Sequence, residues 1–262
     1  MGQSKQRLRR MQQEQPWCVY CGGTTPGTSV DHMPPIAIFD NRDRPKGMEY
    51  LACETCHNGS RALDQLASLL SRAYPDPHTP HAQHEAREHF RGIGNNFPML
   101  LREMKPSPEQ EERARKARDT LPGSRGALAI GPVMRTLLMK FAGRVGLALH
   151  YELCRQIVPV SGGVFGQVYT NASLLDGKFP SNFLGMLGDP KTLRQGSKSV
   201  ESQFSYASKA LEDLSMSAHM ATFRMSFAVQ AFVARDATDL PPPPELGDVD
   251  VTNRIFRPGF LK

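Results

Sequence analysis

The sequence predicts an α+β fold in two parts. A small N-terminal finger held by paired cysteines is followed by helices, and a C-terminal α+β domain contains an antiparallel sheet. Three observations predict this fold: two Cys-x-x-Cys pairs within residues 17–60, an amphipathic helical pattern over 132–158, and alternating apolar and polar residues over 222–234. With 262 residues, the chain can hold one large domain or two small ones.

The composition is that of an ordinary globular protein with a modest basic excess. Hydrophobic residues make up 39%, charged residues 22%, and the formal net charge is +6. Clustered Lys and Arg displace counterions from phosphates, so this balance is compatible with nucleic-acid binding without requiring it. No apolar run approaches the roughly 18 residues of a membrane span. The basic N-terminus lacks the apolar segment of a secretory signal. We therefore expect a cytoplasmic protein without a membrane partner.

The N-terminal half is predicted to contain several helices. Residues 1–16 are rich in Gln, Arg and Lys, which is typical of a short helix or a mobile arm able to touch phosphate, with a solvated tail as the simpler interpretation. Leucines recur at helical spacing over 60–73, and two more helices are predicted over 81–104 and 107–119.

Two breaks divide the chain. Proline-rich residues 74–80 and the Leu-Pro-Gly-Ser-Arg-Gly run at 121–126 cannot continue a helix. We therefore predict three segments: residues 1–75 (the finger with its basic arm), 76–130 (a helical linker region) and 131–262 (the C-terminal α+β domain).

The C-terminal segment combines one long helix with strands. The amphipathic pattern over 132–158 predicts the helix. The alternation over 222–234 predicts a half-buried strand, and residues 204–206 and 214–218 are predicted to form partner strands. No motif in this segment indicates a function.

Four of the five cysteines form two tight pairs, Cys18/Cys21 and Cys53/Cys56, separated by 31 residues. In a reducing compartment such pairs indicate a metal site rather than disulfides. Two knuckles complete a closed, tetrahedral, structural Zn²⁺ site, which replaces the core that a unit of about 40 residues is too small to build. The fifth, Cys154, stands alone and is predicted to be a small core residue.

Further motifs lie around these knuckles. Asp31 and His32 form a pair followed closely by two prolines, and His57 comes directly after the second knuckle, where a helix begins. In combination with the knuckles, these motifs resemble the HNH, or ββα-metal, endonucleases, in the subgroup with two Cys-x-x-Cys zinc knuckles. The resemblance covers roughly residues 17–65 and implies a zinc-stabilised ββα-metal finger.

The resemblance also implies roles. His32 would be the general base that activates water, and Asp31 and His57 would bind one catalytic divalent ion, with Asn58 assisting. That ion would be Mg²⁺ or another such as Mn²⁺ or Ni²⁺. Phosphodiester hydrolysis needs a base and a cation beside the phosphate. We therefore expect an HNH endonuclease acting on nucleic acid, with DNA as the expected substrate, by a one-metal mechanism.

One residue typical of the HNH family has no counterpart in this sequence. The family usually carries an asparagine shortly before the second knuckle, and residues 47–53 contain none. Glu49 or Asn41 is the candidate to orient His32 in its place through a hydrogen bond. Weakened or lost activity is the alternative.

Cationic residues near these motifs are candidates for phosphate contacts. Arg42, Arg44 and Lys46 lie in the loop after the Asp-His pair, and Arg61 begins the helix after His57. A merely solvated loop is the alternative.

Two questions stay open at this point. The rival function is a non-catalytic zinc-finger protein that binds nucleic acid or a protein partner. The sequence also leaves the oligomeric state undetermined.

Overall fold

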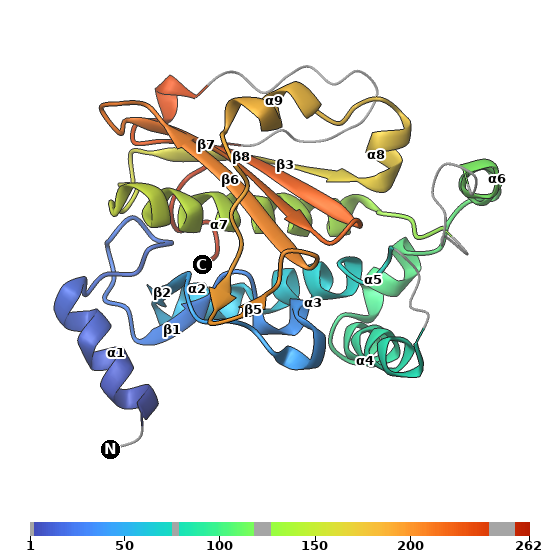
Figure 1. The fold of residues 1–262 in the computed structure, drawn as a ribbon, viewed down its shortest axis with the longest axis horizontal. Helices are drawn as coiled ribbons and strands as arrows, with labels where there is room; N and C mark the ends of the chain where they lie inside the picture. The colour runs from blue at the N-terminus through green and yellow to red at the C-terminus, as the bar shows by residue number, and fades with distance from the viewer. Residues whose placement is uncertain (1–2, 75–78, 118–126, 241–254) are drawn as a thin grey trace.

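The structure is a computed structural model that describes residues 3–74, 79–117, 127–240 and 255–262. It is an α+β fold, as predicted. A long helix, α7 (Pro132–Cys154), packs against one face of a five-stranded antiparallel sheet and also contacts the finger helix α3 (Arg61–Leu70), so α7 lies between sheet and finger (Figure 1). In the described part of the chain, no helix combines the length and apolar character that crossing a membrane requires.

The finger is a short antiparallel hairpin followed by two helices. Its strands pair so that Asp31 lies opposite Tyr50 and His32 opposite Glu49. Successive side chains of a strand point to opposite faces, so Asp31 faces the protein interior while its neighbour does not. The elements are α1 (Gln3–Glu14), β1 (Ser29–His32), the 3₁₀ turns η1 (Ile36–Ile38) and η2 (Asp40–Arg42), β2 (Glu49–Ala52), α2 (Glu54–Gly59) and α3 (Arg61–Leu70).

The predicted helices of the N-terminal half are present, with one correction. The basic N-terminal segment forms helix α1 rather than an extended tail, and α3 buries the leucines that predicted it. The single helix expected over 81–104 is instead two, α4 (Pro80–Asn96) and α5 (Pro98–Glu103). Pro98 lacks an N–H and begins a new helix in its first turn. The next helix is α6 (Pro108–Lys116), whose Ser107 forms a capping box with Gln110.

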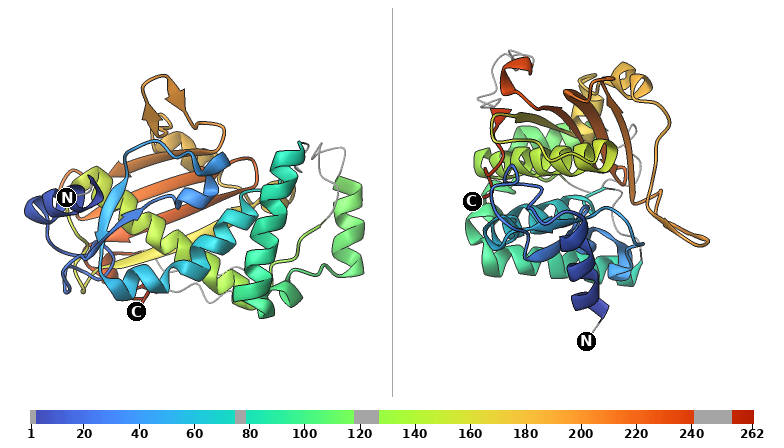
Figure 2. Two further views of the ribbon diagram at one scale, coloured as in Figure 1. Left: turned by 90° about the horizontal axis from the view of Figure 1, so that it is seen from below. Right: turned by 90° about the vertical axis from the view of Figure 1, so that its left-hand side faces the viewer.

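The sheet has the strand order β6-β7-β8-β3-β9, and its described neighbours pair antiparallel. Two short helices lie over the face opposite α7, and Figure 2 shows a small hairpin projecting from the body. The elements are β3 (Gly163–Thr170), α8 (Asn171–Leu175), α9 (Ser181–Met186), the hairpin β4 (Arg194–Gln195) and β5 (Lys198–Ser199), β6 (Phe204–Ala210), β7 (Met216–Phe223), β8 (Phe227–Ala234), η4 (Ala237–Asp239) and β9 (Ile255–Phe256).

The prediction of one continuous strand over 222–234 is wrong. The chain turns at Arg224–Ser226, so this segment is the end of β7 and the whole of β8. Arg224 adopts φ 53° there and Met225 is 70% exposed. The prediction of half-burial also fails for β8, which is buried along almost its whole length because it lies in the middle of the sheet.

Small residues allow α7 to lie close to the sheet. A Cβ added to Gly146 would sit 2.6 Å from the Cβ of Ala231, and one added to Gly166 of β3 would sit 2.9 Å from Ala142 Cβ. A larger side chain at either position would push the helix away from the strands. One hydrophobic core is continuous from the cysteine knuckles through α3 and α7 to the sheet.

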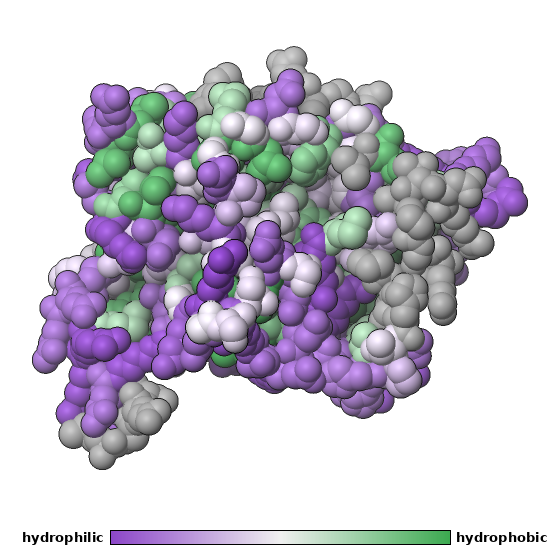
Figure 3. Space-filling view, viewed as in Figure 1, coloured by the Kyte–Doolittle hydropathy of each residue, from purple (hydrophilic) through white to green (hydrophobic). Residues whose placement is uncertain are grey.

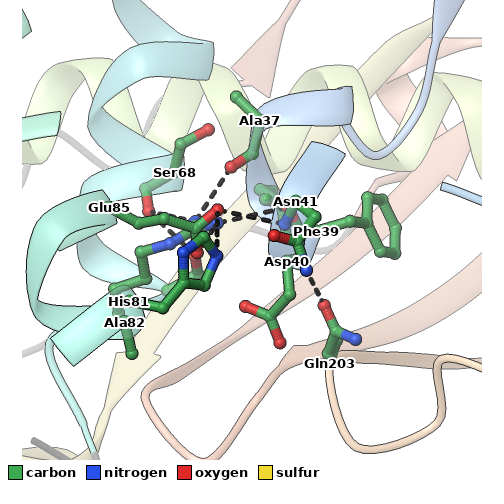
Figure 4. A network of polar contacts seen from close by, with 12 residues as sticks. Ala37, Phe39, Asp40, Asn41, Ser68, His81, Ala82, Glu85 and Gln203 are labelled. Carbon is green, nitrogen blue, oxygen red and sulfur yellow. Dashed lines mark hydrogen bonds and ion pairs between the residues drawn. The ribbon is translucent and has the colours of Figure 1, made fainter. Parts of the chain in front are cut away.

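A polar network fixes the loop that follows β1 (Figure 4). Arg72 donates to the carbonyl oxygens of Ala37 and Phe39 and pairs with Glu85 of α4 at 3.5 Å. Glu85 in turn accepts a hydrogen bond from the backbone N–H of Asn41 at 3.0 Å. From the sheet side, the Gln203 side chain accepts from the N–H of Asp40. The loop is therefore held by α4 and by the sheet together.

Candidate functional site

The four paired cysteines meet in one buried cluster. Their Sγ atoms all lie within 4.8 Å of one another, although the two pairs come from distant parts of the sequence. The first pair lies in the turn before β1, and the second is supplied by the N-terminal end of α2, with Cys53 as its N-cap residue. A hydrogen bond involving Cys56 lowers the pKa of Cys18 to about 5, which favours a thiolate. The cluster is compatible with a structural zinc site.

Asp31 is a buried carboxylate of the finger with a hydrogen-bond partner on each oxygen. It is 4% exposed, its Oδ2 accepts from the Tyr20 hydroxyl at 2.5 Å, and its Oδ1 accepts from Arg144 Nη2 at 2.5 Å. Burial alone would raise the pKa of Asp31, but Arg144 and Tyr20 outweigh it and hold that pKa below its usual range. Asp31 is therefore an ionised carboxylate with both oxygens fixed in place.

His57 points toward the same carboxylate. Its Nδ1 lies 3.8 Å from Asp31 Oδ1, and this buried nitrogen has no hydrogen-bond partner among the residues that the structure describes. The position follows from local structure, because Cys53 caps α2 and accepts the backbone N–H of His57 at 2.9 Å. Buried polar atoms are normally paired, so an unpaired imidazole nitrogen aimed at a carboxylate oxygen needs an explanation.

His32, the residue after Asp31, lines a surface pocket. Its Nε2 lies 3.8 Å from Oε1 of Glu49, the residue opposite it in the hairpin. Burial, followed by the charge of Arg44, lowers the pKa of His32 to about 4. The imidazole is therefore neutral near pH 7, the form that can accept a proton.

The pocket beside His32 has a volume of about 160 Å³, and four of its eight lining residues are cationic. Figure 3 shows that the lower part of the molecule, in the orientation of Figure 1, carries mainly hydrophilic residues. The lining residues are Arg7, His32, Ile36, Arg42, Arg44, Pro45, Lys46 and Glu49.

The candidate phosphate contacts differ in their surroundings. Arg42 and Lys46 are exposed at the pocket. The side chain of Arg44 is only 3% exposed, and its N–H groups donate to five backbone carbonyls between residues 33 and 48. Arg44 thus shapes the loop from within. Arg61 is exposed at the start of α3 and is not among the lining residues.

The loop also carries backbone strain. Asn41, Arg42 and Met48 adopt positive φ values of 54°, 56° and 45°, which are uncommon for residues other than glycine. Such conformations persist only where surrounding contacts enforce them, and they gather at functional sites. In this loop, Arg44 and the network of Figure 4 supply those contacts.

The two candidates for the missing asparagine's role lie in different places. Glu49 lies beside His32, at the distance given above. The backbone N–H of Asn41 is bound by Glu85 of α4, and its side chain is exposed. Asn58 is exposed on α2 next to His57. Of the two, Glu49 is the residue near the imidazole, at a distance longer than a hydrogen bond, and its Oε2 pairs with Arg7.

Sequence reasoning missed three residues around Asp31: Tyr20, Asp64 and Arg144. Tyr20 lies inside the first knuckle, and Asp64 follows His57 by two helical turns. Arg144 of α7 pairs with both Asp31 and Asp64. One signal was available, because Arg144 is the only charged residue in the apolar run 141–149.

No protein-family model matches the sequence, and comparisons with curated proteins and with solved structures find no match.

Proposed function

We propose that the chain is an HNH-type, divalent-metal-dependent endonuclease that hydrolyses phosphodiester bonds in nucleic acid, with DNA as the expected substrate. One observation carries the proposal: Asp31 Oδ1 and the unpaired Nδ1 of His57 converge to 3.8 Å. His32, the residue after Asp31 in the same strand, lines a pocket together with the cationic side chains of Arg42 and Lys46.

The donors around Asp31 fit a hard divalent ion. Asp31 Oδ1 keeps a lone pair beyond the one that accepts from Arg144. His57 offers its Nδ1, which has no hydrogen-bond partner among the described residues. Two carboxylates, Asp31 and Asp64, face one guanidinium, so the group carries a formal charge of −1 that attracts a cation. With two protein ligands the ion would keep positions for water and phosphate, as Mg²⁺ prefers. When bound, it would neutralise charge on the phosphate and stabilise the leaving oxygen.

His32 acts as the general base in this proposal. The neutral imidazole takes a proton from the attacking water as the water oxygen bonds to phosphorus and the bond from phosphorus to the leaving oxygen breaks. Glu49, with Oε1 at 3.8 Å from Nε2, stabilises the imidazolium that forms. Arg42 and Lys46 at the rim hold the phosphate.

The proposal predicts metal-dependent cleavage. Zinc-loaded protein is assayed on supercoiled plasmid, linear duplex DNA, single-stranded DNA and RNA, first without added divalent ion, then with Mg²⁺ or Mn²⁺, then with EDTA. We expect cleavage of at least one DNA form only when the divalent ion is added, with the zinc content unchanged between the first two conditions. Absence of metal-dependent cleavage on every substrate would contradict the proposal and favour a non-catalytic zinc-finger protein.

A further inference from the structure

Arg144 is a charged residue buried in the middle of the protein. It is 1% exposed and belongs to α7, the helix packed between the sheet and the finger. The residues on either side, Gly143 and Val145, are also buried. No solvent is available to the guanidinium, so its contacts within the protein must account for its position.

Those contacts are two carboxylates and one aromatic ring. Arg144 Nη2 donates to Asp31 Oδ1 at 2.5 Å, and Nη1 donates to Asp64 Oδ1. The guanidinium carbon also lies 5.3 Å from the centre of the Tyr20 ring, within the range of a cation–π interaction. The planar fork of arginine is suited to bridging two carboxylates, whereas a lysine ammonium is a single point charge.

The contacts close into a ring that includes His57. Ser60 Oγ lies 3.1 Å from Asp64 Oδ2 and 2.9 Å from the carbonyl oxygen of His57. Arg144 then connects Asp64 to Asp31, whose Oδ1 faces His57 Nδ1. Ser60 has one hydroxyl proton and donates it either to Asp64 or to the His57 carbonyl oxygen, so these contacts link the backbone of His57 to the carboxylate oxygen that His57 faces.

Stability alone is a poor reason for this arrangement. Taking charges out of water is costly, and replacing a buried ion-pair triad by apolar residues of similar volume is often neutral or stabilising. The neighbours of Arg144 along α7 are apolar, whereas its own side chain contacts two carboxylates and an aromatic ring. What an apolar residue cannot do is hold Asp31 Oδ1 at a set position beside His57 Nδ1.

We propose that Arg144 is a positioning residue that fixes Asp31 for the divalent ion shared with His57. This inference rests on the proposed function and extends it: helix α7, from the C-terminal half of the chain, completes the metal site of the finger. Hydrogen-bond partners of metal ligands set ligand orientation, and losing one typically costs about 10- to 100-fold in metal affinity or activity.

The test is a Mn²⁺ titration of the full-length, zinc-loaded chain, following loss of the free-ion EPR signal. Wild type should bind one Mn²⁺ that His57→Ala does not bind. Arg144→Lys keeps the charge but not the fork, so we expect its Mn²⁺ affinity to fall about 10- to 100-fold with the zinc content unchanged. Arg72→Lys is the matched control. It replaces another buried guanidinium, which donates to the carbonyl oxygens of Ala37, Ser68 and Phe39. The Mn²⁺ affinity of this variant should lie within about twofold of wild type.

Asp64→Asn is the second variant, should Arg144→Lys fail to fold. It removes one anchor of Arg144 but retains the contact with Asp31, so Mn²⁺ affinity should fall in the same direction by a smaller factor. If Arg144→Lys folds and binds Mn²⁺ with wild-type affinity, the inference is overturned while the proposed function stands. If only Asp64→Asn folds, wild-type Mn²⁺ affinity in that variant has the same consequence. A wild-type chain that binds no Mn²⁺ at His57 overturns both.

Discussion

Replacing His32 by alanine should lower the rate of metal-dependent cleavage by about 10²- to 10⁴-fold, the usual contribution of a general base. The variant keeps Asp31, His57 and the cysteine cluster, so its zinc content and Mn²⁺ affinity should match wild type. The measurement is the single-turnover rate at saturating Mg²⁺ on the best substrate. A loss in this rate with unchanged ion affinity assigns His32 to the chemical step rather than to binding.

A matched control uses another histidine outside the pocket. His84 is exposed on α4, and His84→Ala should cleave at the wild-type rate. If His32→Ala also keeps a rate within about threefold of wild type, far short of the loss of a general base, the proposed role of His32 is wrong.

Removing one zinc ligand should unfold the finger. Structural zinc contributes an apparent binding free energy of about 10–16 kcal/mol in small fingers, as large as the whole stability of a typical domain at about 5–15 kcal/mol. Cys21→Ser should therefore lose zinc, and with it the position of Tyr20, whose hydroxyl binds Asp31. We expect the fall in zinc content to be accompanied by loss of cleavage.

The chain contains a direct reporter for this change. Its one tryptophan, Trp17, precedes Cys18 and is 44% exposed, so its fluorescence reports on the first knuckle. Cys154→Ser is the control, because Cys154 lies at the end of α7 outside the four-cysteine cluster. Full zinc occupancy and native tryptophan fluorescence in Cys21→Ser would contradict a zinc-dependent finger.

The sequence was most informative about residues that lie close to one another along the chain. The knuckles, the helix after the second knuckle and the Asp-His pair lie within about 50 positions, and short-range geometry controls what they can reach. Arg144 is separated from Asp31 by 113 positions. Its pairing depends on how α7 packs between finger and sheet, and no local pattern encodes that packing. The lone charge in an apolar helix was a usable signal, since such charges are seldom buried unpaired.

The errors in the predicted strands have local causes. The turn at Arg224–Ser226 contains no glycine, proline, asparagine or aspartate, and its one turn-favouring residue, Ser226, fits the alternation, so the pattern continued through the turn. Strand β3 was not predicted, because Gly162 and Gly163 indicate a turn and Gly166 weakens a strand pattern. In the structure, the absence of a side chain at Gly166 lets strand β3 lie close to α7. This packing cannot be read from the local sequence.

In the proposed site, Asp31 and His57 share one divalent ion. The most direct measurement is an anomalous difference map from a crystal of the zinc-loaded chain soaked in Mn²⁺, collected near the manganese edge. We predict one manganese peak within ligand distance, roughly 2.0–2.3 Å, of both Asp31 Oδ1 and His57 Nδ1, distinct from the zinc peak among the four cysteines. A map with zinc but no manganese between these two side chains would contradict the account.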